Sequence, residues 1–183
     1  LHKHYQKNTD SIIDFCKKIV DSTQEYAAAY KINFAFFEQF GSEGFAILKE
    51  LSNYIPHDIL KIADAKRGDI GNTSKAYAKS IFDKLDYDAI TLSPYMGFDS
   101  IQPFLEYKDK LSIILALTSN KGSADFQRLI SDEKPIYKHV LETSRTWTNY
   151  NSIAYVVGAT HPQELEEIRE LLGKETLLLI PGI

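Results

Sequence analysis

The chain has 183 residues, of which 44% are hydrophobic and 25% are charged, and this composition suffices for one sizeable core. A net charge of -4 without any cluster of lysine or arginine argues against a nucleic-acid-binding protein and favours a small-molecule partner. The single cysteine, Cys16, argues against a disulfide scaffold, and no apolar run reaches the roughly 20 residues that cross a bilayer, so we expect a cytoplasmic protein.

The predicted elements alternate between helix and strand. A helix is expected first, over residues 10–26, because Ile12, Phe15 and Ile19 follow the spacing of one buried helical stripe. Short apolar runs of the length of buried strands then lie at residues 28–36, 59–63, 89–92, 111–117, 153–157 and 177–180. Helical patterns separate them at residues 73–85, 135–150 and 162–172. This alternation predicts a parallel sheet covered by helices.

The predicted fold class is therefore α/β, and a (β/α)8 TIM barrel is favoured over an open doubly wound sheet. Six strands fit both architectures, but the chain begins on a helix and stops directly after an apolar strand. We accordingly expect one further barrel strand before Leu1 and one after Ile183. No linker, repeat or low-complexity tract interrupts the chain, so residues 1–183 are interpreted as a single barrel domain, incomplete at both ends.

Charged residues on two predicted strands are candidates for the functional site, because a barrel carries its reactive groups at the carboxyl ends of its strands. Asp64 and Lys66 share one face through their i, i+2 spacing, and Asp69 follows just beyond the strand. Lys31 lies in the preceding apolar run, where a buried lysine needs a nearby anion, and Asp64 is its expected partner. These four residues predict an alternating charged array, with a purely structural ion-pair network as the alternative.

Segment 64–73, with the sequence Asp-Ala-Lys-Arg-Gly-Asp-Ile-Gly-Asn-Thr, resembles the Asp-x-Lys-x-x-Asp signature of orotidine 5'-phosphate decarboxylases in the form of one bacterial subgroup. The other segments that resemble this family, in the family's order, are 30–38, 93–100, 118–122 with Phe126 and Gln127, 156–160 and 180–183. They span essentially the whole chain. The resemblance implies a TIM-barrel lyase that removes carbon dioxide from orotidine 5'-monophosphate (OMP) to give UMP in pyrimidine biosynthesis.

The resemblance also implies the roles of the charged residues. Lys66 would be the proton donor, and Lys31, Asp64 and Asp69 would complete the charged array around it. The family forms homodimers with shared active sites, so Asp69 would reach into the neighbouring subunit's site. Thr73 would contact the ribose from that same neighbour.

Two further groups of residues resemble substrate-binding positions of the family. Ser119 resembles the residue that hydrogen-bonds the pyrimidine edge, with Asn120 as a helper. Pro181 and Gly182 begin a segment similar to the family's glycine-rich phosphate loop. The family's ribose-binding Asp and phosphate-gripping Arg belong to the first and last barrel strands, outside residues 1–183.

The expected chemistry needs neither a cofactor nor a metal, because a lysine kept charged by neighbouring carboxylates can stabilise a carbanion and then protonate it. A metal-dependent sugar-phosphate decarboxylase or synthase of the same barrel group is one alternative. Those relatives carry a carboxylate ligand where Lys31 stands, and a charged ammonium has no lone pair to give to a metal. A catalytically silent nucleotide-binding barrel is the other alternative, and the complete charged array disfavours it.

Overall fold

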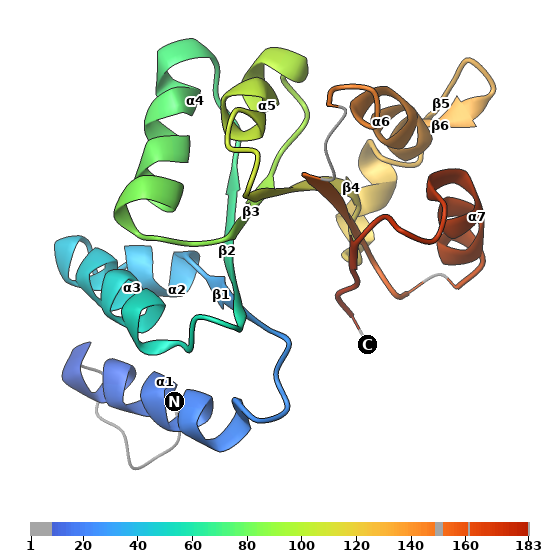
Figure 1. The fold of residues 1–183 in the computed structure, drawn as a ribbon. Coiled ribbons are helices and arrows are strands. Elements are labelled where there is room, and N and C mark those ends of the chain that lie inside the picture. The colour runs from blue at the N-terminus through green and yellow to red at the C-terminus, as the bar shows by residue number, and fades with distance from the viewer. Residues whose placement is uncertain (1–8, 149–151, 161, 183) are drawn as a thin grey trace. The chain divides into compact units, whose positions relative to one another are not determined.

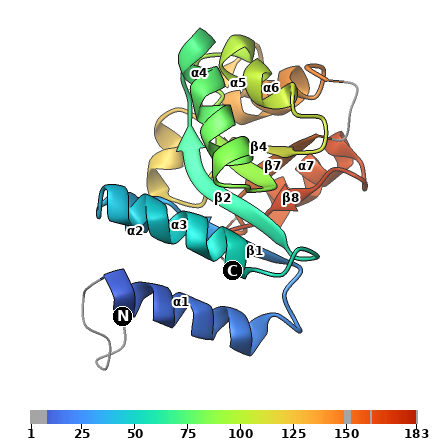
Figure 2. The same cartoon turned by 60° about the vertical axis from the view of Figure 1, so that its left-hand side comes forward.

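The computed structural model describes residues 9–148, 152–160 and 162–182, and the chain divides into two compact units (Figures 1 and 2). The first unit consists of Leu1–Ala65 and Ala78–Ile90, and the second of Lys66–Tyr77 and Thr91–Ile183. Strands β2 (Leu60–Arg67) and β3 (Ala89–Leu92) each run from the first unit into the second. The expectation of a single domain over residues 1–183 stays a prediction.

The first unit places helices against a short parallel sheet. Its other elements are α1 (Thr9–Thr23), β1 (Ala29–Asn33), α2 (Ala35–Glu38), α3 (Ser42–Tyr54) and the π-helix η1 (Lys79–Lys84). Strand β1 pairs with β2 in parallel, from Ala29 opposite Leu60 to Asn33 opposite Asp64. Helices α1 and α3 lie side by side (Figures 1 and 2). The core is built from apolar residues of these elements, among them Val20, Leu48, Leu51 and Ile55, all nearly inaccessible to solvent.

The apolar run at residues 28–36 is a strand only as far as Asn33, so the prediction of a longer strand is wrong. The backbone turns helical at Phe34 and continues as α2. Oδ1 of Asn33 accepts a hydrogen bond from the N–H of Ala35 at 3.1 Å, and this local bond competes with further sheet pairing. Phe34 is completely buried, and its ring packs edge-on against Tyr87 with 5.3 Å between ring centroids. Burial of the aromatic ring therefore accompanies the turn away from the sheet.

The predicted helix at residues 73–85 is interrupted in the middle. It begins as α4 (Gly71–Ala78) and continues as η1, where the N–H of Leu85 bonds to the carbonyl of Ser80, five residues earlier, at 2.9 Å. The wider turn accompanies the burial of Ile81 and Phe82 in the first unit.

The second unit holds the rest of the strands, with helices between them. Its strands are β4 (Leu111–Leu117), β7 (Ile153–Val157) and β8 (Leu178–Leu179), and β7 pairs in parallel with both β4 and β8. Its helices are most of α4, α5 (Phe98–Leu105), the 3-10 helix η2 (Lys121–Asp125), α6 (Ile136–Ser144) and α7 (Pro162–Leu172). An antiparallel hairpin of β5 (Ile130–Ser131) and β6 (Lys134–Pro135) was not predicted. Helix α6 ends at Ser144, earlier than the predicted residue 150, and residues 149–150 lie outside the described residues.

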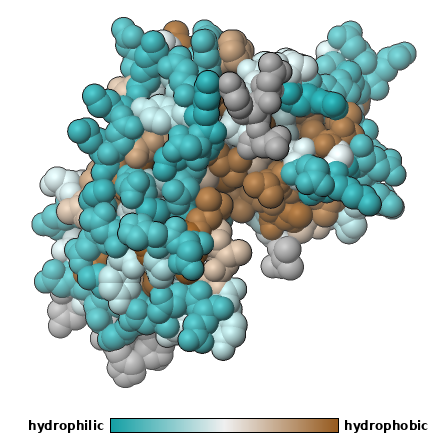
Figure 3. Space-filling model, in the orientation of Figure 1, coloured by the Kyte–Doolittle hydropathy of each residue, from teal (hydrophilic) through white to brown (hydrophobic). Residues whose placement is uncertain are grey.

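Hydrogen bonding orders the strands β1-β2-β3 in the first unit and β2-β3-β4-β7-β8 in the second. The predicted α/β class with a parallel sheet is thus confirmed, and each of the six strands of this sheet was predicted at its place in the chain. Figure 3 shows a largely hydrophilic face, on which hydrophobic residues gather over the strands of the second unit. Leu115, Leu178 and Leu179 are half-buried there, as expected for parallel strands that are apolar on both faces. None of the described helices is long and apolar enough to cross a membrane.

Candidate active site

Lys31 and Asp64 form the ion pair that the sequence predicts. The register places Lys31 opposite Ile62 and Asn33 opposite Asp64, so Lys31 and Asp64 share one face of the sheet. Nζ of Lys31 donates a hydrogen bond to Oδ2 of Asp64 at 3.0 Å. Only 8% of the Asp64 side chain is exposed, so its carboxylate is largely removed from water and Lys31 offsets part of the desolvation cost.

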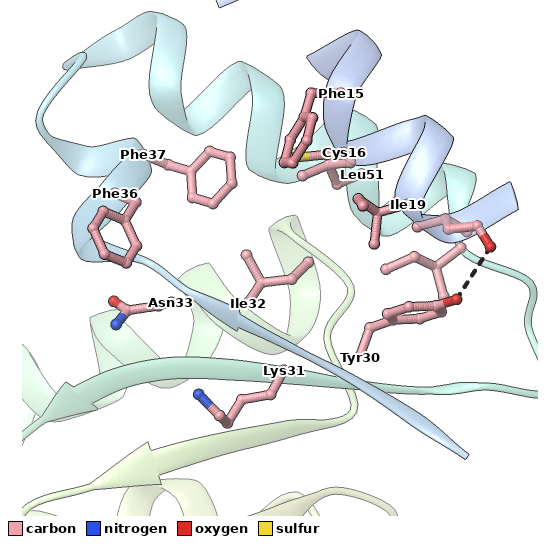
Figure 4. A pocket seen from close by; sticks show the side chains of 12 residues that line it. Phe15, Cys16, Ile19, Tyr30, Lys31, Ile32, Asn33, Phe36, Phe37 and Leu51 are labelled. Carbon is pink, nitrogen blue, oxygen red and sulfur yellow. Dashed lines mark hydrogen bonds between the residues drawn. The ribbon is translucent and has the colours of Figure 1, made fainter. Parts of the chain in front are cut away.

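Lys31 itself is not buried. The prediction that it is a buried lysine is therefore wrong, although its predicted pairing with Asp64 is confirmed. Its side chain is 38% exposed, and it leaves β1 on the side opposite Ile32 (Figure 4). The buried strand lysine of this unit is Lys61, whose side chain is 4% exposed and whose Nζ lies 3.1 Å from Oδ2 of Asp86. Lys61 stands opposite Tyr30, whose hydroxyl bonds to the carbonyl of Val20 on α1. Lys61 therefore lies on the helix-covered face of the sheet.

Sequence reasoning overlooked Lys61 because its run, residues 59–63, reads as an ordinary apolar strand with one lysine in it. The flanking residues could have indicated its burial, because a lysine between four apolar strand residues has few ways to reach water. The Lys61 pair is structural, since its lysine faces α1 rather than the face that carries Asp64.

A cavity of about 360 Å³ in the first unit lies between α1, β1 and the helices that follow β1 (Figure 4). Its walls are mainly apolar, with Phe15, Ile19, Phe37 and Leu51 among the lining residues. Burial raises the pKa of the Cys16 thiol, which also lines this cavity, so the thiol stays protonated near neutral pH. Cys16 thus behaves as a packing residue.

Lys66, Asp69 and Thr73 belong to the second unit, whereas Lys31 and Asp64 belong to the first. Lys66 has a left-handed backbone with φ of 48°, which is uncommon for a residue with a side chain and is often found at functional sites. Its N–H donates to Oγ1 of the buried Thr91 at 2.9 Å. The predicted grouping of Lys66 and Asp69 with Lys31 and Asp64 remains a prediction.

Asp69 and Thr73 lie on the segment that follows β2. Oδ1 of Asp69 accepts the N–H of Ile70 at 2.8 Å, an interaction that fixes this carboxylate against the start of α4. Thr73 is exposed on the first turn of α4, and Ile70 is 53% exposed. Thr73 is therefore at the surface of this chain, whereas Asp69 is half-buried.

Ser119 lies directly after β4, in contact with two glycines. A Cβ on Gly158 would lie 2.8 Å from both N and Cα of Ser119, and a Cβ on Gly182 would lie 3.1 Å from Cβ of Ser119. Gly158 donates its N–H to the carbonyl of Leu117 at 2.7 Å. Gly182 has φ of 90°, a conformation that a residue with a side chain rarely adopts. These glycines allow the ends of three strands to approach the serine.

Pro181 lies shortly after β8. Its carbonyl accepts the N–H of Ala159 at 2.9 Å, so it is bonded to the residue that follows Gly158. The structure thus brings Ser119, Pro181 and Gly182 together, as expected for residues at the carboxyl ends of neighbouring parallel strands.

Sequence reasoning gave no role to Gln127, which fixes the residues on either side of Ser119. Its amide oxygen accepts the N–H of Thr118 at 2.8 Å, and its Nε2 donates to Oγ1 of Thr118 at 2.9 Å. Oγ1 of Thr118 in turn donates to Oδ1 of Asn120 at 2.6 Å. Asn120 is therefore held by its neighbours in the loop.

Among residues 9–148, 152–160 and 162–182, no three His, Cys, Asp or Glu side chains are grouped as metal ligands. In the second unit, Ser119, Pro181 and Gly182 follow the carboxyl ends of parallel strands. This arrangement is typical of the active sites of α/β-barrel enzymes.

The profile of the "Orotidine 5'-phosphate decarboxylase / HUMPS family" matches residues 8–183, and the chain belongs to this family. It is 50% identical over 177 residues to the orotidine 5'-phosphate decarboxylase of Christiangramia forsetii, covering 95% of this chain and 65% of the relative. It is 48% identical over 183 residues to the enzyme of Flavobacterium johnsoniae, covering 98% of this chain and 67% of the relative. The chain thus spans about two thirds of the length of the curated relatives it matches.

Solved structures show the same likeness. Leishmania donovani OMP decarboxylase aligns with a TM-score of 0.94 and 45% identity, covering 97% of this chain and 71% of that chain. Leishmania donovani UMP synthase aligns with a TM-score of 0.93 and 45% identity, covering 97% of this chain and 40% of that chain. These likenesses confirm the predicted barrel fold.

Proposed function

We propose that the protein decarboxylates OMP to UMP in pyrimidine biosynthesis, with Lys66 as the proton donor. The observation that carries the proposal is the ion pair of Lys31 with the largely buried Asp64, two residues before Lys66 on the same strand. The names of relatives that are 48–50% identical support the same reaction. This function also supports the cytoplasmic location that we expect.

The proposed reaction breaks the bond between C6 of the pyrimidine and its carboxylate and releases carbon dioxide. The bonding electron pair stays on C6 in an orbital in the ring plane, where it cannot delocalise as an ordinary enolate does. An ammonium group beside C6 stabilises this charge and then transfers a proton to C6, forming the C–H bond of UMP. Lys66 takes this role, and Asp64, Asp69 and Lys31 complete the charged array around it.

The substrate is held by groups away from the reacting carbon. We propose that Ser119 hydrogen-bonds the pyrimidine edge, with Asn120 beside it, and that Pro181 and Gly182 begin the phosphate-binding loop. The contact of Gly182 with Ser119 supports this assignment, because it links the loop to the base-binding residue. Binding energy from the distant phosphate can then serve to orient the ring at C6. This scheme requires no cofactor and no metal.

The test is an OMP decarboxylation assay on the full-length protein, run with and without a chelator. Lys66→Ala should abolish turnover while leaving the circular dichroism spectrum unchanged, because the lost charge acts in the transition state. Lys174→Ala, which removes an exposed lysine after α7, is the matched control and should retain activity. Near-normal turnover of folded Lys66→Ala would contradict the mechanism. Loss of wild-type turnover in the chelator would instead favour the metal-dependent alternative.

We further propose a homodimer in which Asp69 and Thr73 serve the neighbouring subunit's site. The exposure of Thr73 on the first turn of α4 supports this, because its side chain can reach another chain, and the half-buried Asp69 lies two residues before this helix. Lys66→Ala and Asp69→Ala should each be nearly inactive as homodimers. Subunit exchange should then create mixed dimers with one intact site, restoring roughly a quarter of wild-type activity per chain under random pairing. Demonstrated exchange without recovered activity would refute the shared site but not the decarboxylase function.

A further inference from the structure

Strand β2 contains one more residue than its neighbour β3 between two of their hydrogen bonds. The N–H of Asp88 donates to the carbonyl of Lys61 at 2.9 Å, and the N–H of Ser93 donates to the carbonyl of Arg67 at 2.7 Å. Six steps along β2 therefore correspond to five steps along the segment containing β3. One extra residue on one strand of a pair is the definition of a β-bulge, and bulges serve to redirect a side chain.

The left-handed backbone of Lys66 identifies where the extra residue is accommodated. A left-handed residue other than glycine costs roughly 1 kcal/mol or more, so neighbouring groups must stabilise it. Here the N–H of Lys66 donates to the side-chain hydroxyl of Thr91 on β3 at 2.9 Å. Thr91 is 1% exposed, so water cannot readily replace its hydroxyl.

We propose that Thr91 is a positioning residue that holds the bulge at Lys66 and thereby sets the direction of the lysine side chain. The effect on catalysis rests on the proposed function, whereas the effect on the backbone does not. A valine has nearly the shape of threonine but no acceptor, so Thr91→Val removes the hydroxyl to which the Lys66 N–H donates. A serine keeps the acceptor and loses only a methyl group.

The first experiment measures amide hydrogen exchange in the full-length protein and needs no activity. The Lys66 amide should exchange at least about tenfold faster in Thr91→Val than in the wild type, the change expected when a bond of roughly 1.4 kcal/mol or more is lost. The Ser93 amide, which bonds to the carbonyl of Arg67, is the internal control and should change much less. Unchanged exchange at Lys66, or equal acceleration at both amides, would overturn the proposal.

The second experiment measures OMP decarboxylation. Thr91→Val should lower kcat by about 10- to 100-fold with little change in KM, because a misdirected ammonium weakens the transition state more than substrate binding. Thr91→Ser should recover most of kcat. Ser144→Ala, which removes another buried hydroxyl of the second unit, should lower stability without this loss of kcat. A wild-type kcat in folded Thr91→Val, or an equal loss in Thr91→Ser, would overturn the positioning role.

The two experiments separate the possible failures. If wild-type protein does not decarboxylate OMP, the proposed function fails, and the exchange experiment still decides whether Thr91 holds the bulge. If Thr91→Val does not fold, Thr91→Ser is compared with Thr91→Ala in both measurements. A defect in the alanine variant alone supports the role of the hydroxyl, and equal behaviour of the two variants refutes it.

Discussion

Replacing Gly158 by alanine tests whether the close approach of β7 to Ser119 is needed for both folding and catalysis. The new methyl group would lie 2.8 Å from N and Cα of Ser119 and 2.9 Å from its Cβ, all shorter than the 3.0 Å that real Cβ atoms respect. Two of these atoms belong to the backbone, so the contact cannot be relieved by rotating a side chain. Either β7 or the loop after β4 must move.

The expected magnitude follows from this overlap. Inserting a methyl group into a well-packed place costs about 1–3 kcal/mol, which lowers the melting temperature of a chain of this size by about 2–12 °C. A displaced Ser119 also loses its proposed bond to the pyrimidine, worth about 0.5–1.5 kcal/mol, so catalytic efficiency should fall about 2- to 12-fold. Thermal unfolding and steady-state kinetics on the full-length protein measure the two effects.

Gly173→Ala is the matched control for this variant. Gly173 follows α7 with φ of 76° and has no atom within 4 Å of an added Cβ, so alanine there strains only the backbone. It should lower the melting temperature but leave the kinetics unchanged. The reasoning would be refuted if Gly158→Ala kept wild-type stability and kinetics, or if both variants lost the same catalytic efficiency.

Two further predictions concern single side chains. Ser119→Ala should reduce turnover less than Lys66→Ala, because it removes a neutral hydrogen bond of about 0.5–1.5 kcal/mol, and equal kinetic defects would show that Ser119 has another role. In the first unit, Asp86→Asn should lower the free energy of unfolding by about 1–3 kcal/mol, since it leaves the buried ammonium of Lys61 without its counter-charge. Lys61→Met should lower the free energy of unfolding by at most about 1 kcal/mol, because the remaining carboxylate of Asp86 is half exposed. Denaturant titrations that rank the two variants in the opposite order would contradict this account.

The sequence by itself determined the strands, the α/β class and one ion pair. Apolar runs of strand length alternate with helical periodicity, and this pattern is local, so each of the six strands of the parallel sheet was predicted at its place in the chain, whereas the β5–β6 hairpin was not. The pairing of Lys31 with Asp64 was also predictable, because opposite charges on consecutive parallel strands are brought together by their common direction. The resemblance to one family rests on local motifs in the same way.

Tertiary structure alone decided which lysine is buried and how the site residues are held. Lys31 and Lys61 both lie in apolar runs, but only Lys61 faces the side of the sheet that α1 covers. The left-handed backbone of Lys66 depends on a hydroxyl 25 positions away, and the place of Ser119 depends on Gly158, which follows another strand. Such contacts depend on which surfaces pack together in the folded chain. The pattern of residues within one segment does not determine that packing.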